Sequence, residues 1–101
     1  MEMLRRHLDR VRCVHLKDID EDRLGEARQQ RLNFHAAVRN GVFARLGDGA
    51  IDFAAVLAAL EAGGFDGWAV VEQDVLEGGR GAATPLDNAK AGRQFLRSLG
   101  Y

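Results

Sequence analysis

The stretch W-A-V-V-E-Q-D at residues 68–74 constrains the fold more than any other part of this sequence. It is a short apolar run that ends in acidic residues. A buried parallel strand has this order, because it is apolar along its length and opens into a polar site at its carboxyl end. Side chains alternate along a strand, so Trp68, Val70, Glu72 and Asp74 are expected to share one face.

A second run of the same kind covers residues 11–17 and is followed by Asp18. Alternation predicts two faces for this strand, one with Val11, Cys13, His15 and Lys17, the other with Arg12, Val14 and Leu16. Polar residues again gather at the carboxyl end. If the two strands are neighbours, His15 and Lys17 are therefore expected near Glu72.

Helical patterns flank and separate the two strands. The clearest helix is predicted at residues 53–62, where an apolar stripe follows Asp52, a good N-cap. The last helix is predicted from Thr84 to about Leu99, with Thr84 as N-cap and Pro85 at the first helical position. Its inward face is expected to hold Leu86, Ala89, Phe95, Leu96 and Leu99.

Three weaker patterns complete the chain. Residues 2–9 look like the end of a helix, and Asn33 can cap a short helix that ends before Gly41. Residues 21–30 suit a surface helix or an ordered loop. Residues 42–51 are predicted to be a loop, whose Gly47-Asp48-Gly49 could cradle a phosphate, although an ordinary tight loop is the default for two glycines.

Strands that alternate with helices imply right-handed crossovers and a parallel sheet, and hence the α/β class. Two parallel strands, each apolar on both faces, need neighbours that this sequence does not supply. Residues 1–101 are therefore expected to form one domain at most, or a piece of a larger α/β domain.

Composition excludes several classes of function. The net charge is −1, with 14 basic and 15 acidic residues, which gives no electrostatic case for nucleic acid or an anionic membrane as a partner. No apolar run is long enough to span a bilayer, and the N-terminus lacks the apolar stretch of a signal peptide. A single cysteine, Cys13, suits a reducing cytoplasm.

The polar strand ends allow two interpretations. An imidazole and a carboxylate, His15 and Glu72, could share a divalent metal, or they could form a plain hydrogen bond. Lys17 could hold an oxyanion or act in acid–base chemistry, or simply reach solvent. Trp68 is expected to pack in the core or to form a wall of the site. Cys13 is expected to be a small core residue rather than a ligand.

Three motifs together resemble the xylose isomerase-like TIM-barrel family: C-V-H-L-K-D (13–18), G-V-F-A-R-L-G-D-G-A-I-D-F (41–53) and G-W-A-V-V-E-Q-D (67–74). Within that family the pattern is most similar to the C-terminal part of the inosose dehydratases of inositol catabolism. The resemblance implies the last two strand–helix units of an eight-unit barrel, strands 7 and 8 with their helices. The barrel in this chain is then incomplete.

The resemblance also implies a metal site. The family binds manganese, cobalt, magnesium or zinc through four side chains, and His15 and Glu72 match two of them. The other two, a glutamate and an aspartate on mid-barrel strands, have no counterpart in this chain. Lys17 matches a lysine near the substrate, while Cys13 stands where many relatives carry a second histidine.

The expected function follows from these matches. The chain is interpreted as a piece of a metal-dependent isomerase, epimerase or dehydratase that acts on a keto-sugar or cyclitol, with Lys17 catalytic and with Lys17 and Trp68 binding substrate. The isolated chain is expected to be inactive. The alternative is a non-catalytic remnant or structural module that self-assembles or complements a separate chain. A third possibility is a longer reading frame, with the remaining strands encoded just upstream.

Overall fold

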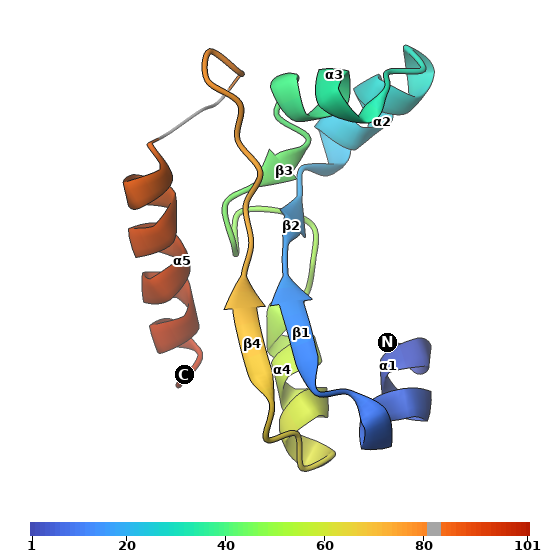
Figure 1. Cartoon of the computed structure of the whole chain (residues 1–101), viewed down its shortest axis with the longest axis vertical. Coiled ribbons are helices and arrows are strands. Elements are labelled where there is room, and N and C mark those ends of the chain that lie inside the picture. Colours follow the sequence, from blue (N-terminus) through green and yellow to red (C-terminus); the bar gives the residue numbers. More distant parts are fainter. Residues whose placement is uncertain (81–83) are drawn as a thin grey trace.

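The computed structural model describes residues 1–80 and 84–101 of the chain (Figure 1). In chain order its elements are α1 (Glu2–His7), the 3₁₀ helix η1 (Leu8–Arg10), β1 (Cys13–Leu16), β2 (Asp18–Ile19), α2 (Glu21–Gln29), α3 (Phe34–Arg39), β3 (Phe43–Ala44), α4 (Phe53–Ala62), β4 (Trp68–Val71) and α5 (Pro85–Ser98).

The predicted helix starts are confirmed by the hydrogen bonds that cap them. The side chains of Asn33 and Asp52 accept the backbone N–H groups of the third residues after them, at 3.0 and 2.9 Å. Thr84 does the same for the N–H of Asp87 at 3.1 Å, ahead of Pro85. Asp20 caps α2 in the same way, which explains why residues 21–29 are a helix rather than a loop.

The main sheet pairs β1 with β4 in parallel. Its register pairs Cys13 with Trp68 and Leu16 with Val71. The side chains of two paired residues therefore lie on the same face of the sheet. The chain then bends, and β2 forms a short antiparallel ladder with β3. The prediction that residues 42–51 form only a loop was therefore wrong at Phe43 and Ala44, because these two residues pair with the continuation of the first strand.

The core lies on one face of the β1–β4 sheet, beneath which α4 runs (Figure 1). Its buried residues are Leu16, Leu46, Phe53, Leu57 and Leu60. The predicted alternation is confirmed in β1, where Leu16 is buried and Val14 partly buried, while Cys13 and His15 are exposed on the other face. The expectation that Cys13 is a core residue was wrong, since its side of the sheet is uncovered.

The inward face of α5 differs from the prediction. Phe95, Leu96 and Leu99 pack against the core as expected, but Leu86 is 62% exposed and Ala89 is also exposed. Asn88 and Gly92 are buried instead. A Cβ at Gly92 would contact the side chains of Val71 and Leu46, so the missing side chain lets the helix approach the sheet along this line.

All four residues of β4 are exposed, and the side chain of Trp68 is 80% accessible. A central strand of a parallel sheet is normally covered on both faces. The architecture is thus α/β with parallel strands and helices, consistent with part of a TIM barrel, and no closed barrel exists within residues 1–80 and 84–101. Over the same residues, no helix combines the length and the apolar character needed to cross a bilayer.

Candidate functional site

His15 and Glu72 meet at the carboxyl ends of the two parallel strands, as predicted. The Nδ1 atom of His15 lies 2.7 Å from Oε2 of Glu72. The backbone fixes this approach, because the N–H of Glu72 donates to the carbonyl of Leu16 at 2.9 Å and so extends the ladder beyond β4. The alternation of each strand turns both side chains to the face opposite the core.

Lys17 joins the same cluster from the end of β1. Its Nζ atom donates to Oε1 of Glu72 at 2.7 Å and to Oδ2 of Asp74 at 2.6 Å. The ammonium group also lies 4.3 Å from the ring centroid of Phe43, a cation–π contact. Lys17 is therefore held on three sides, with only 23% of its side chain exposed. The alternative prediction, that Lys17 simply reaches solvent, was wrong.

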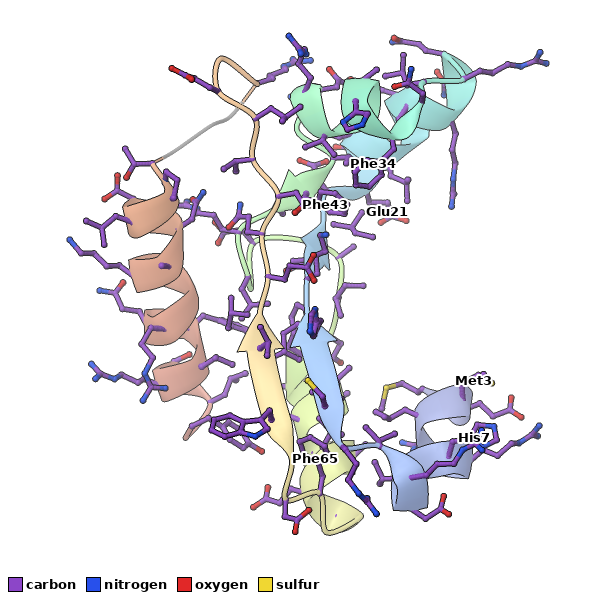
Figure 2. All side chains as sticks on the ribbon, in the orientation of Figure 1. Met3, His7, Glu21, Phe34, Phe43 and Phe65 are labelled. Carbon is purple, nitrogen blue, oxygen red and sulfur yellow. The ribbon has the colours of Figure 1, made fainter. Side chains whose placement is uncertain are left out.

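Phe43 lies on β3, at the end of the molecule toward which β1 and β4 point (Figure 2). Its ring packs against that of Phe34, with the centroids 6.2 Å apart. No sequence pattern predicts this contact, since Phe43 falls in a segment expected to be a loop. Asp74 was expected on the face of Glu72, but only the structure shows that it binds Lys17.

The charges of the cluster stabilise one another. Hydrogen bonds from Lys17 and then from His15 lower the pKa of Glu72, against the opposing effect of partial burial. Burial alone would lower the pKa of Lys17, but the hydrogen bonds to Asp74 and Glu72 outweigh it and raise that pKa. At neutral pH the lysine is thus a cation. It can donate a hydrogen bond or a proton to an oxyanion.

The donor set fits half of a divalent metal site. An imidazole nitrogen and a carboxylate, His15 and Glu72, are ligands that Zn²⁺, Mn²⁺ and Co²⁺ accept, and both lie on the open face of the sheet. Catalytic sites use at least three protein ligands. Residues 1–80 and 84–101 contain no group of three or more histidine, cysteine, aspartate or glutamate side chains that could hold a metal. The predicted proximity is confirmed, and the role as metal ligands stays a prediction.

Asp18, the first residue of β2, has a structural position although it directly follows Lys17 in the chain. Its side chain is 1% exposed, and its two carboxylate oxygens accept four backbone N–H groups at 2.9 to 3.1 Å, from Ile19, Gly47, Gly49 and Ile51. The glycine loop of residues 47–51 therefore cradles an internal carboxylate. Its N–H groups are occupied, which contradicts the phosphate cradle and leaves the tight loop.

Trp68 lies at the opposite end of β4 from Glu72. The register places its side chain on the same face as the cluster, four residues earlier along the strand. At about 3.3 Å per residue this separates the two Cα atoms by roughly 13 Å. The expected packing of the indole in the core was wrong, since it is exposed. Its role in substrate binding stays a prediction.

Parallel strands joined by helices, with a polar cluster at their carboxyl ends, define an α/β protein consistent with part of a TIM barrel. The chain belongs to the xylose isomerase-like TIM barrel family, whose model matches residues 1–99. It is 40% identical to an inosose dehydratase of Geobacillus thermodenitrificans (strain NG80-2) over 97 residues, which are 96% of this chain and 32% of that protein.

Two further relatives show the same coverage. The chain is 39% identical over 97 residues to an inosose dehydratase of Erwinia tasmaniensis, covering 96% of this chain and 32% of that protein. It is 37% identical over 99 residues to an inosose dehydratase of Geobacillus kaustophilus (strain HTA426), covering 98% and 31%. The expected similarity to inosose dehydratases is confirmed, and the chain spans about a third of the length of these relatives.

Proposed function

We propose that this chain supplies two ligands, His15 and Glu72, of a divalent metal site in an enzyme that acts on a keto-sugar or cyclitol, with inosose as the first substrate to test. One observation carries the proposal: the 2.7 Å contact between an imidazole and a carboxylate at the carboxyl ends of neighbouring parallel strands. The names of the relatives, all inosose dehydratases, support the substrate class.

On this proposal β1 and β4 are strands 7 and 8 of the barrel. The remaining two ligands, a glutamate and an aspartate in the family pattern, then come from outside these 101 residues. We accordingly propose that the chain alone is inactive, because it offers two donors where a catalytic site needs at least three. A rate on inosose close to that of a full-length relative would contradict this.

Lys17 is the residue to which we assign catalysis. A divalent metal, Mn, Co, Mg or Zn, supplies Lewis-acid polarisation of a carbonyl and its neighbouring hydroxyl when bound. Lys17 stays protonated beside Glu72 and Asp74, so its ammonium can donate to a substrate oxygen on which negative charge develops. The ring of Phe43 and the carboxylate of Asp74 hold the ammonium in position for that role.

Trp68 is proposed to line the substrate cavity of the complete barrel, because it lies on the same face as the cluster. The cytoplasm is the proposed compartment, since the single cysteine, Cys13, is a free and exposed thiol that suits a reducing environment.

The test is isothermal titration of the chain with Mn²⁺. The proposal expects micromolar binding that is lost in both His15→Ala and Glu72→Ala. His35→Ala is the matched control, because His35 lies exposed on α3, outside the cluster, and its loss should leave binding unchanged. Absence of binding by the unaltered chain, or equal binding by all three variants, would refute the assignment.

A structural module is the second candidate, and one observation favours it. Both carboxylate oxygens of Glu72 are already engaged, one by His15 and one by Lys17, so the cluster satisfies its own polar groups without a metal. On this view Glu72→Gln lowers the melting temperature and the titration shows no Mn²⁺ binding. Such a module would complement a separate chain that carries the remaining strands.

A further inference from the structure

We propose that the loop after β4 (residues 72–80) is joined at Arg80 to the helical segment of residues 20–44, and that this junction positions the ammonium group of Lys17. Asp74 lies in the loop and Phe43 in the helical segment, so the two segments hold Lys17 from different sides. The part that Lys17 plays in the reaction rests on the function proposed above, whereas the junction itself does not.

The junction contains a backbone hydrogen bond. The N–H group of Arg80 donates to the carbonyl of Arg39, the last residue of α3, at 2.9 Å. Carbonyls in the last turn of a helix have no partner within the helix, so the loop supplies a donor that the helix end needs. Figure 1 shows the chain after β4 continuing past β3 toward α3.

Glycines allow the two backbones to come this close. A Cβ at Gly41 would lie 2.7 Å from the carbonyl oxygen of Arg80, and a Cβ at Gly79 would lie 3.3 Å from that of Arg39. Gly41 also has a φ of +79°, a conformation that residues with a side chain rarely adopt. The sequence thus has a glycine on each side of the junction.

The side chain of Arg80 adds an ion pair. Its Nη1 atom lies 3.7 Å from Oε2 of Glu26 on α2. The same oxygen accepts hydrogen bonds from the side chains of Asn40 and Arg23, at 3.1 and 3.2 Å. These bonds, that of Asn40 first, lower the pKa of Glu26, so the carboxylate is charged at neutral pH. Exposed ion pairs are weak, so the backbone hydrogen bond is expected to be the stronger part of the junction.

Close packing connects the junction to Lys17. The cavity between the two segments has a volume of about 20 Å³, roughly the space of one water molecule. Phe43 and Asp74 line this cavity together with Gly41 and Arg80. Segments packed this closely cannot shift independently, so opening the junction is expected to move Phe43 away from Lys17. All of these contacts are made between residues of this chain, so they do not depend on further barrel strands.

The junction has a consequence for the proposed reaction. Lys17 has three partners, Glu72, Asp74 and Phe43. On the proposed function Glu72 is also a metal ligand, so its carboxylate is shared. Asp74 and Phe43 are then the partners that serve Lys17 alone, and the junction keeps these two at a fixed separation.

The test is nuclear magnetic resonance of the metal-free chain with isotope-labelled lysine. The chain has only two lysines, so Lys90, which is exposed on α5, gives the reference signal. In the unaltered chain the ring of Phe43 should show a nuclear Overhauser contact to the end of the Lys17 side chain, because the ammonium lies 4.3 Å from the ring centroid.

Arg80→Pro opens the junction from the side of the loop. Proline has no N–H group to donate to Arg39, and residue 80 lies outside every strand and helix, so both sheets should remain. The Overhauser contact between Phe43 and Lys17 is expected to be lost. Arg80→Ala removes only the ion pair and keeps the N–H group, so the contact is expected to persist.

Gly41→Ala opens the junction from the side of the helical segment, and it should also lose the contact. Gly64→Ala is the matched control, since Gly64 has a φ of +70° and nothing within 4 Å of an added Cβ. It introduces similar backbone strain far from the junction and should keep the contact. An unchanged contact in Arg80→Pro or in Gly41→Ala, or an equal loss in Gly64→Ala, would overturn the proposal.

Mn²⁺ titration of the same chain tests the metal function separately. If the junction variants lose the contact and the chain binds no Mn²⁺, the junction is supported and the metal function fails. If the chain binds Mn²⁺ and the junction variants keep the contact, the reverse holds.

Discussion

Replacing Asp18 with asparagine tests whether the buried carboxylate holds the molecule together. Its Oδ1 accepts the N–H groups of Ile19 and Ile51, and its Oδ2 those of Gly47 and Gly49. Asparagine keeps one oxygen and turns an NH₂ group toward two donors. Two charge-assisted hydrogen bonds are thus lost, each contributing about 1.5–3 kcal/mol.

The expected loss is about 3–6 kcal/mol in the free energy of unfolding, a large part of the roughly 5–15 kcal/mol that stabilises a typical domain. Urea denaturation followed by circular dichroism measures it. Amide hydrogen exchange should show one pair of N–H groups, Gly47 and Gly49 or Ile19 and Ile51, becoming unprotected in the variant, because the NH₂ group replaces one of the two acceptor oxygens.

Asp48→Asn is the matched control, since Asp48 lies in the same loop between the two glycines. Its carboxylate is exposed and pairs with Arg45 at 2.9 Å, an interaction that contributes about 0–1 kcal/mol. If Asp18→Asn shifts the denaturation midpoint no more than Asp48→Asn does, the carboxylate does not organise the loop, and the reasoning fails.

The remaining predictions concern pH and glycines. Hydrogen bonds from Lys17 and His15 lower the pKa of Glu72, so their stabilisation is present above its usual value of 4.5 and is lost as pH falls through the lowered pKa. Melting curves recorded across this range should depend less on pH in Glu72→Gln; an unchanged profile would refute the pairing. Gly25 is inside α2 with open space around it, so Gly25→Ala should stabilise by about 0.5–1 kcal/mol. Gly49→Ala would place a Cβ against the buried carboxylate and should destabilise by about 1–3 kcal/mol, measured by denaturation; opposite signs would contradict the packing.

Local rules predicted the elements and the proximity of the main site residues. Capping residues such as Asn33 and Asp52 fix helix starts through hydrogen bonds within four residues, so a short window of sequence contains the cause. Alternation along two strands, once these are neighbours, places His15 beside Glu72. The first inference needs only neighbouring residues, and the second adds one assumption, that the two strands pair.

Contacts between segments that are far apart in the chain could not be predicted from sequence patterns. Nothing local to Asp18 indicates that a loop some thirty residues later folds around its carboxylate. The ring of Phe43 beneath Lys17 has the same origin, since β3 exists only because β2 pairs with it. On α5 the apolar Leu86 suggested an inward face, but Leu86 is exposed, and Gly92 is the residue that lies close to Val71 and Leu46.

The segment that carries α2 and α3 leaves the sheet and returns to it at nearly the same point. The N–H of Asp20 donates to the carbonyl of Val42 at 3.0 Å, so the two ends of the segment meet. The two helices lie beyond the carboxyl ends of β1 and β4 (Figure 1). Closing a longer or shorter chain between fixed ends changes the free energy only slowly with length. The free energy of closing this segment therefore depends little on its length, so variants with a longer or shorter segment between Asp20 and Val42 are expected to keep His15 and Glu72 in place.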